Sequence, residues 1–244
     1  MRALAASLVL LAVAGPAVAA SPLVDEMQTL ATHYHENPQK LDELKVGLER
    51  AAEADPDVET LLALSWACLL YGDVRATTVD EKLAAYDRGR QAARQAIELA
   101  PKNGRAQFWY GANTGRWGQT KGAMRALLLL PTVKEAMETA LALDPGYVPT
   151  YSLAGSIYYE VPGFAGGDLD RSEAMFRKGL EIDPHYTTMR VGLARTLLKK
   201  GHAADARREL EAVLAETAPS NPADWTVKDA PQARALLSGM KEKS

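Results

Sequence analysis

Apolar residues recur along this chain at intervals of three and four positions, the spacing that places them on one face of an α-helix. In the C-terminal third, one such face contains Met189, Leu193, Leu197 and Leu198, and the next contains Ala203, Ala206, Leu210, Val213 and Leu214. Gly201 and His202 separate the two faces, which predicts two helices joined by a tight turn. No run alternates between apolar and polar residues for long enough to predict a β-strand. We therefore expect an all-α protein.

A recurring proline closes the helical stretches. An apolar residue and a small or acidic residue precede the better copies, and the copies fall at Pro56, Pro101, Pro145, Pro184 and, in weaker form, Pro219. Successive prolines are 45, 44, 39 and 35 residues apart. Proline cannot continue a helix, and it moves the preceding residue out of the α region. The chain is thus predicted to repeat a pair of helices that ends at proline.

This pattern resembles the tetratricopeptide repeat, a helical hairpin of about 34 residues. The fit is best over residues 147–184 and 187–219, and the earlier units are longer. The resemblance implies a right-handed superhelix of about five helical hairpins with expanded middle repeats. We expect it to occupy residues 21–220, and we expect a C-terminal capping helix (232–241) and tail within residues 221–244.

A narrower resemblance rests on three segments of the middle region. Residues 101–111 (PKNGRAQFWYG), the long helix through residues 127–130 and residues 162–168 (PGFAGGD) together look like the T component associated with TRAP transporters, a periplasmic helical repeat protein. The same region is similar to the helical domain of regulator of microtubule dynamics proteins. The resemblance covers roughly residues 57–215. It implies a binding protein that works with a TRAP-type importer of small organic anions.

The first residues predict export. Arg2 precedes an uncharged apolar run at residues 4–14, and Pro16 and the small residues 17–21 follow it. This order is typical of a secretory signal peptide, which we place at residues 1–20. The run is shorter than the roughly 20 residues of a membrane span, although a retained interfacial anchor is an alternative. The only cysteine is Cys68, so we expect a periplasmic protein without a lipid-bearing cysteine.

Charge and motif content narrow the class of function. The chain has 28 Lys and Arg residues against 31 Asp and Glu residues, interspersed rather than in blocks, which argues against a nucleic-acid or membrane partner. The four histidines make no metal pair, and no catalytic motif is present. Residues 115–122 contain three glycines but lack the Gly-Lys-Ser/Thr ending of a phosphate loop, so we expect them to shape a turn. We predict a non-enzymatic protein without metal or cofactor.

Candidate binding residues follow from the register of each hairpin's first helix, because a helical solenoid exposes these helices on its concave side. Small residues that we expect at the helix crossings set the register: Ser65, Gly111, Gly155 and Ala194. The groove-facing candidates are then Trp66, Phe108, Ala112, Arg116, Ser156, Tyr159, Arg195 and Lys199. If the three cations converge, they favour a carboxylate or phosphate ligand. If they do not, they are solvated charges on helix faces.

For three further features, more than one interpretation stays open. Of the aromatic residues 108–110, we expect Trp109 in the core and Phe108 or Tyr110 at the rim, forming either a ligand cage or inter-repeat packing. Phe164 is either held over the groove mouth or part of a longer turn, after which Asp170 and Glu173 cap a helix. The leucine run at residues 127–130 before Pro131 is an oligomer contact, the wall of an apolar cavity or buried core.

Two functions therefore compete. One is a periplasmic accessory binder that holds a small organic anion or a transporter's binding protein. The other is a cell-envelope scaffold that docks protein segments in its concave groove.

Overall fold

The computed structural model describes residues 22–241, and every regular element in that range is helical. The hairpins are α1 (Pro22–His33) with α2 (Lys40–Ala54), α3 (Val58–Val74) with α4 (Val79–Leu99), α5 (Gly104–Lys121) with α6 (Ala123–Leu143), α7 (Val148–Glu160) with α8 (Leu169–Ile182), and α9 (Thr187–Lys199) with α10 (Ala203–Ala215). The short helix α11 (Pro222–Asp224), a π-helical turn η2 (Trp225–Asp229) and α12 (Ala230–Lys241) follow. The prediction of an all-α superhelix of about five hairpins is confirmed. The predicted signal peptide at residues 1–20 lies outside the described residues.

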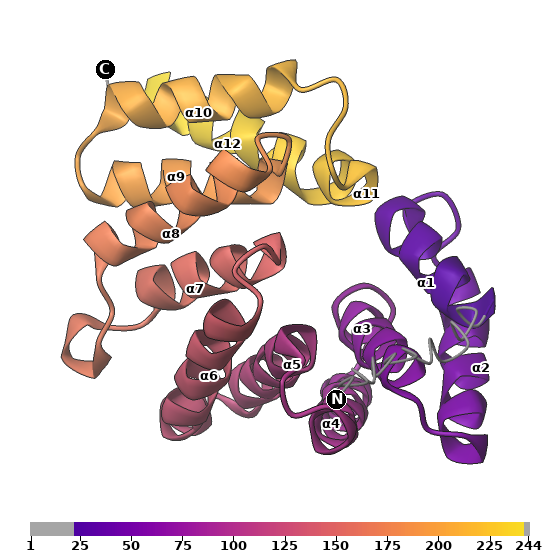
Figure 1. The fold of residues 1–244 in the computed structure, drawn as a ribbon. Helices are drawn as coiled ribbons and strands as arrows, with labels where there is room; N and C mark the ends of the chain where they lie inside the picture. The colour runs from indigo at the N-terminus through magenta and orange to yellow at the C-terminus, as the bar shows by residue number, and fades with distance from the viewer. Residues whose placement is uncertain (1–21, 242–244) are drawn as a thin grey trace, which may run out of the picture.

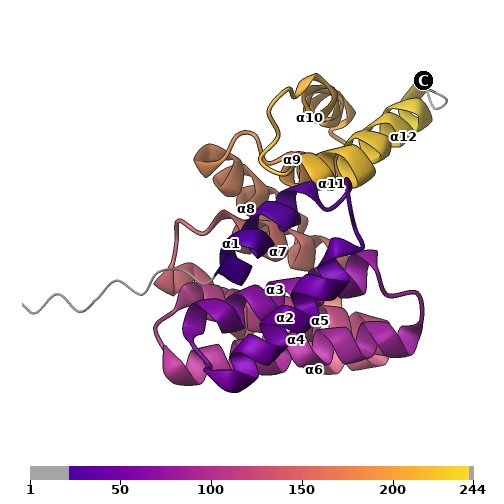
Figure 2. The same ribbon diagram turned by 90° about the vertical axis from the view of Figure 1, so that its right-hand side faces the viewer.

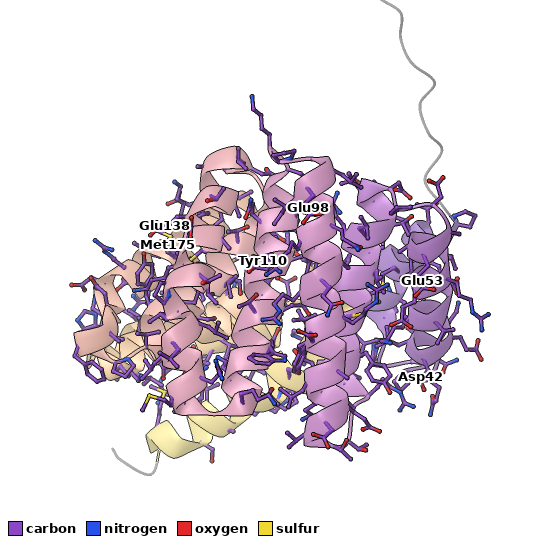
Figure 3. The ribbon with its side chains drawn as sticks, turned by 90° about the horizontal axis from the view of Figure 1, so that it is seen from below. Asp42, Glu53, Glu98, Tyr110, Glu138 and Met175 are labelled. Carbon is purple, nitrogen blue, oxygen red and sulfur yellow. The ribbon has the colours of Figure 1, made fainter. Side chains whose placement is uncertain are left out.

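The hairpins stack side by side into an arc (Figure 1). The first helices face the middle of the arc, where α3 contacts α5 and α7 contacts α9, while α2, α4, α6 and α10 lie on the outside. Figure 3 views the outer helices from below, with the exposed Glu53, Glu98 and Glu138 on α2, α4 and α6. Within residues 22–241, no helix is both long enough and apolar enough to cross a bilayer.

Proline and capping residues set the helix boundaries. The helices α2, α4, α6 and α8 each end two residues before a proline of the predicted series. At the starts, Asp57 caps α3 by accepting a hydrogen bond from the backbone of Thr60. Thr78 and Glu81 form a reciprocal capping box at α4. These side chains satisfy backbone N–H groups that have no partner within the helix.

Small residues occupy the crossings between paired helices. Ser65 and Gly155, two of the residues that set the predicted register, are buried. The Ser65 hydroxyl donates a 2.9 Å hydrogen bond to the carbonyl of Gly89 between α3 and α4, and the Ser172 hydroxyl donates a 2.8 Å bond to Gly155 between α8 and α7. A Cβ atom on Gly155 would lie 2.6 Å from a ring carbon of Phe176. Glycine therefore sets how closely α7 and α8 approach.

The turn between α5 and α6 is shorter than predicted. The prediction that residues 115–122 shape this turn is wrong for most of the segment, because α5 continues as far as Lys121. The turn is made at Gly122, whose φ of 111° lies in a region that favours glycine. Gly118 instead packs within the hairpin, where an added Cβ would lie 3.3 Å from the backbone of Ala126. Helix packing, not chain reversal, explains this glycine.

The cap of α8 also differs from the prediction. Asp168 is the N-cap, and its carboxylate accepts hydrogen bonds from the backbone N–H groups of Asp170 and Arg171. Asp170 therefore lies in the first turn rather than at the cap. Glu173 contacts Lys200, directly after α9, at 2.7 Å instead of closing a capping box. This ion pair uses the Glu173 side chain for contact between hairpins.

The leucine run lies near the N-terminal end of α6. Pro131 is inside this helix, Leu128 is 65% exposed and its neighbours in the run are half-buried. The interpretation as buried core is therefore wrong for Leu128, whose side chain faces solvent. An oligomer contact through this run stays a prediction.

Candidate functional site

Aromatic rings form a continuous series across the inner helices. Trp66 of α3 stacks on Trp109 of α5 at a centroid distance of 5.3 Å. Phe108 meets the edge of Trp109 at 4.8 Å and of Tyr147 at 5.2 Å. Edge-to-face and offset stacks are the favoured geometries for such rings. The series therefore joins α3 and α5 to the residue that precedes α7.

Most of this series is core rather than ligand surface. Trp109 is 4% exposed, as predicted, but Phe108 is 6% and Ala112 is 8% exposed. The placement of Phe108 and Ala112 on the groove surface is therefore corrected. Tyr147, which precedes α7, covers the face of α5 that carries Phe108, and helical spacing within α5 cannot reveal this neighbour. Trp66 stays half-buried and keeps part of its ring available.

Three of the predicted groove residues meet at the C-terminal ends of α7 and α9. The ammonium of Lys199 lies 3.6 Å from the ring centroid of Tyr159, and the guanidinium carbon of Arg195 lies 4.5 Å from it. Arg195 pairs with Glu160 at 3.0 Å, and Lys199 donates a 3.3 Å bond to the Tyr159 carbonyl. The two cations thus have a single carboxylate near them, and it pairs with Arg195. We call Tyr159, Glu160, Arg195 and Lys199 the tyrosine–cation cluster; it has spare donors for an anionic group.

The third predicted cation has a different partner. Arg116 of α5 pairs with the Asp73 carboxylate of α3 at 3.0 Å. The Tyr86 hydroxyl donates a 2.7 Å hydrogen bond to the same carboxylate, and burial together with this bond raises the pKa of Tyr86. Of the two alternatives for the three cations, full convergence is therefore wrong: Arg195 and Lys199 meet at Tyr159, while Arg116 pairs with Asp73.

The last two predicted residues are accessible. Ser156 is exposed on α7, one turn before Tyr159. Phe164 is 88% exposed in the short 3-10 helix η1 (Gly163–Ala165). Lys134 of the outer helix α6 holds this loop by donating to the Gly166 carbonyl at 3.2 Å. The loop is thus fastened to the outer layer, and a ligand role for Phe164 stays a prediction.

The two ends of the described chain meet beside α3. Tyr34, directly after α1, donates a 2.7 Å hydrogen bond to Asp224 of α11. The side-chain amide of Asn221 donates a 3.3 Å bond to the carbonyl of Ala31. Two perpendicular views show α11 lying against α1 (Figures 1 and 2). Polar contacts therefore join the first hairpin to the segment that follows the last hairpin.

A small pocket lies at this junction, which we call the end-to-end pocket. It encloses about 110 Å³, and its wall includes the rings of Tyr34 and Trp66, the carboxylates of Asp73 and Asp224, and Lys228. Lys228 pairs with Asp224 at 2.9 Å, and its ammonium lies 5.6 Å from the Tyr34 ring centroid. Burial, followed by the hydrogen bond to Asp224, raises the pKa of Tyr34. Tyr34 therefore remains a neutral donor at physiological pH.

A larger hollow of about 560 Å³ lies over the loop between α4 and α5. Its lining is Ala100, Pro101, Lys102 and Asn103. It is open to solvent and brings no set of polar groups together, so we do not place the site there.

A buried carboxylate anchors the C-terminal segment to α9. Asp229 is 2% exposed and accepts hydrogen bonds from the hydroxyls of Thr187 at 2.7 Å and Thr188 at 2.8 Å. Burial raises the pKa of Asp229 to about 6, although both hydrogen bonds act in the opposite direction. The nearby Asp224 raises the pKa further, and Lys228 lowers it. The short segment of residues 224–229 thus contributes Asp224 and Lys228 to the end-to-end pocket and Asp229 to this anchor.

Sequence reasoning missed most of the end-to-end pocket. Trp66 was among the candidates, but Tyr34, Asp73, Asp224 and Lys228 were not. Residues 221–244 were expected only to cap the stack, and α12 does pack against α10. Contact between positions 190 residues apart leaves no periodic signal in the chain.

Comparisons with known proteins agree with this architecture. Residues 23–164 match the family described as Regulator of microtubule dynamics protein 1-3, and residues 164–228 match the tetratricopeptide repeat. The crystal structure of TTC0263, a thermophilic TPR protein of Thermus thermophilus, is 19% identical; the match covers 88% of this chain and 99% of that chain with a TM-score of 0.64. The crystal structure of MamA is 18% identical over 79% of this chain and 93% of that chain, with a TM-score of 0.50. These likenesses show the fold alone. Comparison with curated proteins gives no match.

Proposed function

This chain belongs to the Regulator of microtubule dynamics protein 1-3 family, and from that premise and its tetratricopeptide-type hairpins we propose that it is a non-enzymatic scaffold that binds a segment of another protein along its inner helices. Helical repeats suit this task because their concave surface contacts an extended chain over several units. The observation that carries the proposal is the tyrosine–cation cluster. Two consecutive inner helices, α7 and α9, together present an aromatic ring and two cations to solvent.

The size of the enclosed space favours a segment over a drug-sized molecule. Pockets for such molecules usually enclose about 300–1,000 Å³. The end-to-end pocket encloses about 110 Å³, enough for the end of one side chain. A segment can place one side chain there and others on neighbouring helices.

The charge of the tyrosine–cation cluster predicts one feature of the partner segment. The tyrosine–cation cluster carries two positive charges and one negative charge, so an acidic side chain of the partner fits beside Arg195 and Lys199. Each exposed ion pair contributes at most about 1 kcal/mol. The cluster therefore selects the register of the segment, and most of the affinity has to come from contacts spread along the inner helices.

Site-specific photo-crosslinking tests this proposal. A crosslinking residue at Ser156 probes the inner face beside the cluster, and one at Glu138 probes the outer face of α6 as the matched control. We expect a discrete protein product from Ser156 that Glu138 does not give. With the partner purified, R195A together with K199A should weaken binding about fivefold to tenfold, the scale of one or two exposed pairs. Equal crosslinking from both positions would contradict a groove-bound segment.

A small organic anion is a second candidate, and the net positive charge of the same cluster supports it. If the ligand is a small organic anion, the protein assists TRAP-type import in the periplasm. Calorimetric titration with small dicarboxylates and monocarboxylates tests it, since R195A should abolish any heat of binding that the wild-type chain gives. Binding that is indifferent to both Arg195 and Lys199 would remove the support from the cluster.

The proposal also includes export of the protein and the boundaries of its segments. The composition of residues 1–20 supports a cleaved signal peptide, followed by the solenoid at residues 21–220 and a capping segment at residues 221–244. N-terminal sequencing of the protein recovered from the cell envelope tests the first boundary. A chain that retains residues 1–20, or that stays in the cytoplasm, would contradict export.

A further inference from the structure

The walls of the end-to-end pocket are suited to a positively charged side chain. The carboxylates of Asp73 and Asp224 reach it from α3 and α11, and the rings of Tyr34 and Trp66 form apolar walls. Aromatic faces attract cations, and carboxylates accept charge-assisted hydrogen bonds. An acidic side chain would instead lie beside two carboxylates, and only Asp73 keeps a cation, Arg116, when Lys228 is absent. The pocket chemistry thus favours lysine or arginine.

A side chain of this protein already takes that position. Lys228 places its ammonium 2.9 Å from Asp224 and 5.6 Å from the centroid of the Tyr34 ring. The Lys228 side chain is 45% exposed and lies one helical turn from its partner. Exposed pairs of this kind are among the weakest in proteins. Lys228 can therefore leave at little cost.

Asp224 would stay in place after such an exchange. Its Oδ1 atom accepts the Tyr34 hydroxyl at 2.7 Å, and its Oδ2 atom lies 3.2 Å from the amide of Asn221. Asp73 is fixed in the same way by Tyr86 at 2.7 Å and by Arg116 at 3.0 Å. A carboxylate has roughly four acceptor positions, so both keep capacity for a further donor. The site is preorganised without Lys228.

We propose that the end-to-end pocket binds a lysine or arginine side chain of the partner segment, and that Lys228 occupies the position until the partner displaces it. This inference rests on the proposed function for the source of the side chain. It adds a second, oppositely charged requirement to the acidic residue at the tyrosine–cation cluster. Because the end-to-end pocket is formed by residues from both ends of the stack, binding there also depends on contact between the two ends.

Nuclear magnetic resonance on the full chain tests the pocket directly. The probes are short glycine–serine peptides that carry one lysine, arginine, acetyl-lysine or glutamate. The signal is the indole N–H of Trp66, assigned with W66F. We expect the lysine and arginine peptides to shift this signal saturably, and the acetyl-lysine and glutamate peptides to leave it unchanged. An equal response to acetyl-lysine would overturn the proposal.

Three variants separate a binding role from a structural one. K228A should tighten binding of the lysine peptide about twofold, because it removes the internal competitor. K178A is the matched control, since Lys178 lies 5.6 Å from the centroid of the Tyr151 ring and away from the pocket, and it should change nothing. D224N should weaken binding about fivefold or more, with folding checked by the thermal midpoint. Binding by K228A that is no tighter than wild type would contradict the proposal.

Failure of the pocket proposal can be distinguished from failure of the proposed function. Partner crosslinking from Ser156 that persists while Trp66 fails to respond to any basic peptide would sink only the pocket proposal. Loss of the Ser156 product with an intact response at Trp66 would sink the groove-bound segment instead.

Discussion

The hydroxyl of Tyr34 and the carboxylate of Asp224 lie 2.7 Å apart although 190 positions separate them in the chain. This hydrogen bond connects the first hairpin to the segment that follows the last one. A helical solenoid otherwise holds together through contacts between neighbouring repeats. The bond therefore couples the stability of the two ends.

We predict that Y34F weakens this connection. The change removes one buried donor and leaves Asp224 with fewer partners, so the free energy of unfolding should fall by about 1–2 kcal/mol. Hydrogen exchange should quicken at the amides of both α1 and α11, because each end depends on the other.

The matched control is Y151F. The Tyr151 hydroxyl donates to the carbonyl of Pro145, only six positions away, at 2.9 Å. This variant should lose similar stability without faster exchange at α1 and α11. If Y34F accelerated exchange in α1 alone, the two ends would not be coupled.

The crossing of α7 and α8 should not tolerate a methyl group. G155A places a Cβ atom 2.6 Å from a ring carbon of Phe176, which is 2% exposed and cannot move freely. Overpacking of this kind costs about 1–3 kcal/mol, measurable by urea unfolding. The control is G239A in α12, where an added Cβ has no atom within 4 Å among the described residues. It should raise stability by up to about 1 kcal/mol, because alanine favours helix.

Asp229 should make stability depend on pH. Burial raises its pKa to about 6 from an ordinary value of 3.8, so the folded chain holds this proton more tightly than the unfolded chain. Its contribution is therefore fully present below the unfolded pKa and is lost as pH rises through about 6, by at most about 3 kcal/mol. Urea titrations between roughly pH 4 and pH 7 should show this fall in wild type and a smaller one in D229N. Parallel pH curves for the two proteins would refute the assignment.

Cys68 should react only when the protein opens. The thiol is fully buried in α3, and burial raises its pKa to about 12, so almost no thiolate is present at neutral pH. The sequence also predicts burial, because Cys68 lies in the apolar stretch 61–70 and a free cysteine there behaves as a small hydrophobe. Alkylation by iodoacetamide should follow the rate of opening and rise steeply at the urea midpoint. Rapid labelling under native conditions would show that α3 exposes this face.

Among the predicted groove residues, sequence-based prediction succeeds for Arg195 and Lys199 and fails for Phe108. Arg195 and Lys199 lie four positions apart on one helix, so local geometry alone puts them on the same face. Their meeting with Tyr159 then required only the register of neighbouring hairpins. The predicted groove position of Phe108 is wrong, because Tyr147 covers this residue. The sequence of one helix does not show which of its faces another element will cover.

The chain by itself determined the helices, the prolines that end them, the small residues at their crossings and the resemblance to a repeat family. These features are local, since each depends on residues within a few turns of one another. Only the tertiary structure decided that Asp73 neutralises Arg116, and that Asp224 and Lys228 form a pocket with Tyr34 and Trp66. Such contacts depend on how several hairpins sum their small rotations along the stack, which no single repeat encodes.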